Sequence, residues 1–127
     1  MTKHQYSTDL FAAHAAIDAE IERLSRMLDV YESGPRSAGV AGEREHKKMQ
    51  ALFDKACDER IPLDDAVIAA PISDGKQIAY NAKVIARIEE TAPPEIAAEL
   101  WREHARHVIA YADVLSQKEW ISFSAAA

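Results

Sequence analysis

The chain has 127 residues, of which 48% are hydrophobic and 28% are charged, and its net charge is −6. This length fits a single domain that can bury a core, and the composition excludes a disordered chain. Nucleic-acid binding usually requires a basic stripe, because neutralised phosphates supply most of the affinity. The longest basic run is only Lys47-Lys48, so we expect no nucleic-acid partner.

The cysteine and hydropathy patterns indicate the compartment. Cys57 is the single cysteine, so an intrachain disulfide is impossible, as suits a reducing environment. The segment 1–10 lacks the apolar core of a secretory signal, and the apolar stretch 66–72 is too short to cross a bilayer. We therefore predict a cytoplasmic protein with no membrane role.

A first helix is predicted over 6–33. Ser7, Thr8 and Asp9 can cap its start, and Gly34-Pro35 can end it. Its apolar side follows steps of four and three, the spacing of a helix packed at a shallow angle against others. These positions are Leu10, His14, Ile17, Ile21, Leu24, Leu28 and Tyr31.

The segment 33–42 holds three of the four glycines and is predicted to be a loop. A second helix follows over 42–60. Pro62 and Pro71 then punctuate a connector, in which a short helix over 63–70 could start at Pro62 and cover one end of the core. The sequence thus predicts a break between two helices near Ile61.

Two further helices are predicted over 74–91 and 94–118. Asp74 can start the third helix, and Pro93-Pro94 separates it from the fourth. Short connections make consecutive helices antiparallel neighbours. The predicted fold is therefore all-α, a four-helix up-down-up-down bundle with a short extra helix between the second and third helices.

A metal site is one functional hypothesis. Asp18 and Glu22 lie one turn apart on the first predicted helix, as do Glu103 and His107 on the fourth. If these helices are antiparallel neighbours, the four side chains form a cluster that could bind a transition metal, because carboxylates and imidazoles are common ligands. His14 and His104 lie on the apolar sides of the same helices and could support those ligands.

Two observations weigh against this site. Bundles that bind two metal ions use paired Glu-x-x-His motifs, whereas here only Glu43-x-x-His46 has that spacing, and it is predicted to lie opposite Tyr31. The same carboxylates could instead form surface salt bridges with arginines on the same helices, for a modest gain in stability. These arginines are Arg23, Arg26, Arg102 and Arg106.

Enzymatic activity is not favoured. Cys57 lies beside an apolar stripe, where free cysteines are usually packed as small hydrophobes. No glycine-rich phosphate loop or serine nucleophile elbow is present. Asp64-Asp65 lies at the start of the short predicted helix and is interpreted as a complement to its dipole. We identify no catalytic residue.

Protein–protein contact is the leading hypothesis. Three large apolar residues follow the apolar side of the fourth predicted helix, and the core of one bundle does not need them. They are Trp120, Ile121 and Phe123. Leftover apolar patches usually mark interfaces, and most soluble oligomers are two-fold homodimers. We therefore expect a homodimer with these residues as anchors. A small-molecule pocket lined by Trp101, His104 and Tyr111 is a third possibility, without a supporting motif.

Overall fold

The computed structural model describes the backbone of residues 3–33 and 39–126, and the side chains of residues 9–33, 39 and 42–120. The described residues form four α-helices and no strand. The all-α prediction is therefore confirmed. The chain divides into two compact units, residues 1–67 and 68–127.

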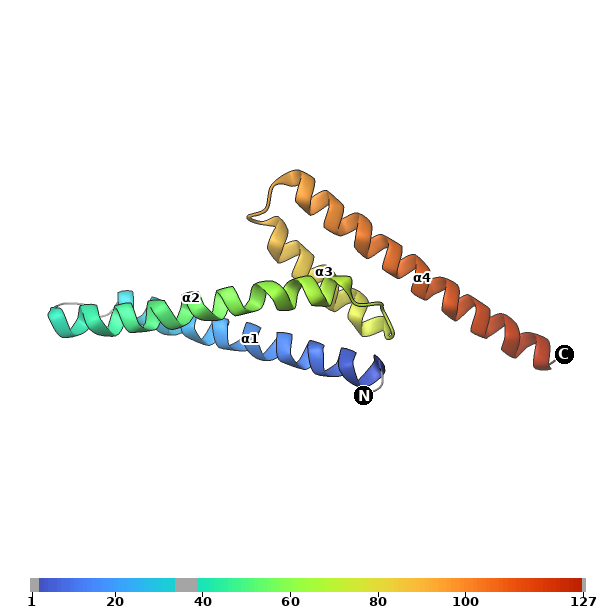
Figure 1. The fold of residues 1–127 in the computed structure, drawn as a ribbon, viewed down its shortest axis with the longest axis horizontal. Coiled ribbons are helices and arrows are strands. Elements are labelled where there is room, and N and C mark those ends of the chain that lie inside the picture. The colour runs from blue at the N-terminus through green and yellow to red at the C-terminus, as the bar shows by residue number, and fades with distance from the viewer. Residues whose placement is uncertain (1–2, 34–38, 127) are drawn as a thin grey trace. The chain divides into compact units, whose positions relative to one another are not determined.

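Unit 1 is an antiparallel pair of long helices, α1 (Lys3–Glu32) and α2 (Val40–Ala69) (Figure 1). The contacts give the register directly. His14 contacts Asp64, and Asp18, one turn later in α1, contacts Arg60, one turn earlier in α2. The two helices therefore run in opposite directions without a shift of register over this turn.

The core of unit 1 lies between these helices. Ile21 and Leu24 of α1 and Ala56 of α2 are buried together, with Ile17, Phe53 and Cys57 packed against them. Leu28 is also buried. The predicted apolar stripe of the first helix thus identifies its packed side, because residues at steps of three and four share one side of a helix.

The predicted break near Ile61 is wrong, because α2 continues through Pro62 to Ala69. Proline removes a backbone N–H and clashes with the preceding turn, so it usually bends or ends a helix. Here Arg60 and Asp64 lie on either side of Pro62, and both contact α1. The segment 63–69 is therefore the last part of α2 rather than a separate helix, and these contacts favour its continuation.

The start of α1 also differs from the prediction. The helix begins at Lys3, so Ser7, Thr8 and Asp9 lie within it and are not caps.

At the other end of the hairpin, Gly39 has a φ of 92°, a left-handed conformation that glycine adopts without steric cost. This residue directly precedes α2.

Unit 2 contains α3 (Gly75–Glu89) and α4 (Pro94–Ala126), which pack against each other. The N-cap of α3 is Asp74, whose carboxylate accepts a hydrogen bond from the backbone N–H of Lys76, as the sequence predicts. At 1.5 Å per residue, α3 is about 22 Å long and α4 about 50 Å. Only part of α4 can therefore lie beside α3.

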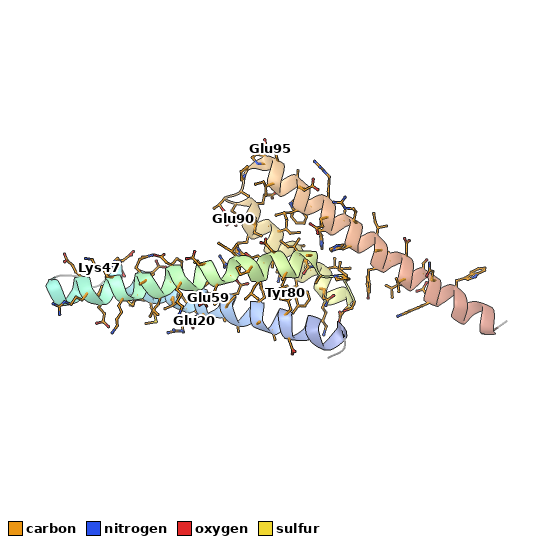
Figure 2. The ribbon with its side chains drawn as sticks, in the orientation of Figure 1. Glu20, Lys47, Glu59, Tyr80, Glu90 and Glu95 are labelled. Atoms are coloured by element: carbon orange, nitrogen blue, oxygen red, sulfur yellow. The ribbon has the colours of Figure 1, made fainter. Side chains whose placement is uncertain are left out.

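The burial of side chains along α4 reflects the difference in length between α3 and α4. Ala97 and His104 in the first half of α4 are 4% and 8% exposed, whereas Leu115 in the second half is 42% exposed, although the spacing of seven and eleven residues places all three on one side of the helix. In Figure 2, side chains extend from both sides of the second half of the α4 ribbon. The second half of α4 thus offers apolar surface that α3 does not cover.

Candidate functional site

The most buried polar group of unit 1 is the imidazole of His14, which is 0% exposed. Its Nε2 lies 2.6 Å from Oδ1 of Asp64, a carboxylate that is also buried. On the other side of the ring, Nδ1 lies 3.6 Å from Oδ2 of Asp18. Arg60 Nη1 donates a hydrogen bond of 3.0 Å to Oδ1 of Asp18. We call these four residues the histidine network.

The histidine network links two helices through carboxylates that alternate with nitrogen-bearing side chains. Buried polar groups are costly without partners, and here each carboxylate contacts a nitrogen of the opposite helix or of the ring. Because the ring of His14 is fully buried, it cannot contact a substrate. Its position between the two carboxylates instead holds α1 and α2 in register.

A second polar cluster lies near the loop end of the same hairpin. Tyr31 donates a hydrogen bond to the backbone carbonyl of Gly42 and stacks on His46, with ring centroids 6.0 Å apart. Nε2 of His46 lies 3.0 Å from Oε1 of Glu32. The predicted position of His46 opposite Tyr31 is therefore confirmed.

Trp101 makes two contacts in the first half of α4, a hydrogen bond and a ring contact. The indole N–H of Trp101 donates a 2.9 Å hydrogen bond to Oε2 of Glu89, which connects α4 to the end of α3. The ring of Trp101 also meets His104 edge-on, with centroids 6.0 Å apart. Burial lowers the pKa of His104, and the nearby charge of His107 lowers it further. The neutral imidazole is therefore favoured in the folded protein.

An exposed stripe runs along the second half of α4. Ile109, Asp113, Ser116 and Trp120 follow one another at steps of four, three and four, so they share one side of the helix. Ile109 is 61% exposed and Trp120 is 68% exposed, and the two residues between them are also exposed. We call these four residues the α4 stripe.

A pocket of about 440 Å³ lies on a different side of α4. Its α4 wall includes His107, Tyr111, Val114 and Lys118, which repeat the four-three-four spacing two residues before the α4 stripe. A shift of two positions is about 200° around a helix. The opposite wall is the non-helical segment 71–73, which precedes α3.

The residues of the predicted metal cluster have other surroundings within their own units. Asp18 belongs to the histidine network, and Glu22 lies 3.8 Å from Arg26. His107 lines the pocket, and its Nδ1 is a buried atom without a hydrogen-bond partner among the described residues. Glu103 is half-buried.

The predicted cluster combines Asp18 and Glu22 of unit 1 with Glu103 and His107 of unit 2. Because the four residues belong to two different units, this combination stays a prediction. Among the residues that the structure describes, no three His, Cys, Asp or Glu side chains come together as metal ligands. Of the supporting histidines, His14 contacts Asp64 and His104 contacts Trp101.

The predicted interface is described in part. Trp120 is exposed, whereas the side chains of Ile121 and Phe123 lie outside the described residues.

None of the described helices combines the length and the apolar character that a membrane-spanning helix needs.

Asp64 and Arg60 are the residues whose roles sequence reasoning missed. The break expected near Ile61 removed Asp64 from the second helix and hid its alignment with Arg60. The signal that could have found them is a matched pair of spacings. Arg60 and Asp64 are four residues apart, as are His14 and Asp18. An antiparallel pair of helices can therefore pair His14 with Asp64 and Asp18 with Arg60.

Comparison with known proteins adds no relative: no protein-family model, no curated protein and no solved structure matches the chain.

Proposed function

We infer that this protein acts through protein–protein contacts and that its first partner is a second copy of itself, bound through the α4 stripe. The observation that carries this inference is the exposure of Ile109 and Trp120 on one side of a helix whose second half extends beyond α3. Large exposed apolar residues that share one side of a helix are typical of interfaces.

The order of residues along the α4 stripe favours a second copy as the occupant. In a two-fold pair of antiparallel helices, each residue meets a residue equally far from the centre on the other copy. A centre between Val114 and Leu115 places Ile109 opposite Trp120 of the second copy. The same centre places Asp113 opposite Ser116. Apolar residues then meet apolar residues, and a carboxylate meets a hydroxyl that can donate a hydrogen bond.

Light scattering coupled to size-exclusion chromatography tests the dimer. We expect twice the chain mass at micromolar concentration, and monomers for Ile109→Glu and Trp120→Glu, because each buries an unpaired charge twice in a two-fold interface. Ile96→Glu is the matched control, since Ile96 is 52% exposed on α4 but lies outside the stripe. A monomeric parent at these concentrations, or a dimer that persists in both stripe variants, would contradict the proposal.

Two substitutions at Ser116 test the antiparallel arrangement itself. Ser116→Asp would oppose Asp113 of the other copy, whereas Ser116→Lys would form an ion pair with it. Each contact occurs twice, so with surface pairs of 0.2–1 kcal/mol we expect the dissociation constants of the two variants to differ by about tenfold. Equal dissociation constants would refute this register.

Two finer predictions belong to the same proposal. The single cysteine supports a cytoplasmic location. The antiparallel pair in unit 1 and the packing of α3 against α4 in unit 2 are compatible with an up-down-up-down bundle. The alternative function, a transition-metal site formed by Asp18, Glu22, Glu103 and His107, is tested by elemental analysis of protein purified without chelator. Metal bound by the parent and lost in the Glu103→Ala, His107→Ala double variant would establish that site.

A further inference from the structure

The pocket of unit 2 has the composition of a small-molecule site. Its volume of about 440 Å³ falls within the range of 300–1,000 Å³ that is usual for ligand pockets. Pro71 and Ile72 contribute to one wall, and Val114 and Leu115 to the other. Val114 is 47% exposed and Leu115 is 42% exposed, so apolar surface faces solvent there. An apolar ligand would gain free energy by removing this surface from water.

One cationic group lies among these apolar walls. Lys118 lines the pocket and forms no salt bridge with any side chain that the structure describes. The long aliphatic part of a lysine can pack on apolar surface while its ammonium group stays in water, where it can pair with an anion. A ligand with an apolar body and one negative group would satisfy both features.

The remaining polar groups are compatible with a carboxylate. Tyr111 lines the same pocket, and its phenolic hydroxyl group can donate a hydrogen bond to a carboxylate oxygen. His107 also lines the pocket, and its partnerless buried Nδ1 carries a free-energy penalty that a hydrogen-bonding ligand could relieve. Within the part of the chain whose side chains are described, no aspartate or glutamate lines the pocket to repel an anion.

We propose that the pocket between segment 71–73 and α4 binds a small monocarboxylic acid with an apolar chain or ring, whose carboxylate pairs with Lys118. The pocket lies on a different side of α4 from the α4 stripe, so this inference does not depend on the dimer. It also differs from the pocket considered from the sequence, because Tyr111 lines it and Trp101 and His104 do not.

Methyl and aromatic NMR titrations of the whole protein test the proposal with octanoate as the probe. We expect saturable shifts at Ile72, Val114, Leu115 and Tyr111. Octanol and octylamine have the same chain length but lack the negative charge, so both should bind more weakly. Shifts confined to Ile109 and Trp120, or no saturable shift at millimolar octanoate, would overturn the proposal.

Substitution of Lys118 separates charge recognition from apolar adsorption. Lys118→Met keeps an unbranched side chain and removes the charge. It should weaken octanoate binding about tenfold, as expected for the loss of a charge-assisted contact, and leave octanol binding unchanged. Lys55→Met is the matched control, since Lys55 is an exposed lysine of α2. Equal octanoate binding by Lys118→Met and the parent would refute the assigned role of Lys118.

Discussion

Replacement of His14 by leucine tests the histidine network directly. Leucine has a similar volume and keeps the site filled, so the main loss is the 2.6 Å contact with Asp64. The Asp64 side chain is only 8% exposed and cannot recover full hydration where it lies. Removal of one partner from a buried polar pair usually costs more than the pair contributes, because the other group stays buried and has lost a hydrogen-bond partner.

We expect His14→Leu to lower the free energy of unfolding by about 3 kcal/mol, within the ranges measured for such losses. Total stabilities are about 5–15 kcal/mol, so this change is large. Urea unfolding followed by far-UV circular dichroism measures it. Tryptophan fluorescence is unsuitable, because Trp101 and Trp120 both lie in unit 2.

A double-mutant cycle isolates the contact. Asp64→Leu in the His14→Leu background should restore part of the lost stability, because it removes a buried carboxylate that has lost its contact with His14. The exposed pair of Glu20 and Arg23 is the control, and Glu20→Gln should leave the urea midpoint unchanged. A loss below about 1 kcal/mol in His14→Leu, or additive effects in the cycle, would refute the reasoning.

Three further predictions concern single residues. Burial lowers the pKa of His104, so at pH values below the unfolded pKa of about 6.5 the folded state binds fewer protons at this residue than the unfolded state, and stability is lost as the pH falls. His104→Leu should therefore reduce the difference between the urea midpoints measured at neutral and at mildly acidic pH, and an unchanged difference would contradict this. Pro62→Ala should raise the free energy of unfolding by about 1 kcal/mol, because the interior N–H is restored; a decrease would show that α2 needs its proline. Gly39→Ala should lower it by about 1 kcal/mol, because alanine is strained at a φ of 92°, and thermal unfolding that matches the parent would exclude that strain.

Periodicity predicted the helices better than their ends. The steps of four and three along α1 correctly selected Ile21, Leu24 and Leu28 as core residues. Proline predicted the helix ends less well. The lost hydrogen bond and the steric clash of Pro62 destabilise the helix locally, but contacts with α1 that exist only in the folded hairpin oppose this effect. In α3 the buried residues include Asn81, which an apolar pattern does not select.

The candidate sites were predictable to different degrees. The apolar character of Trp120 marked the exposed end of α4 before its surroundings were known. The pocket could not be derived from periodicity, since one wall is the non-helical segment 71–73, whose position depends on tertiary packing. The sequence correctly places His14 and His104 on the apolar sides of their helices, where both are buried. The contact of His14 with Asp64, however, depends on the continuous α2.

The unequal lengths of α3 and α4 have a consequence for the dynamics of unit 2. Helical stability in proteins comes mostly from packing on other elements. Amide hydrogens in the first half of α4 should therefore exchange slowly with solvent, and those in the second half should exchange faster. Anything that occupies the second half, whether a second chain or a small acid, would slow that exchange. The protection of these amides would then rise in proportion to the occupancy of the second half, and hydrogen exchange would measure binding without any label.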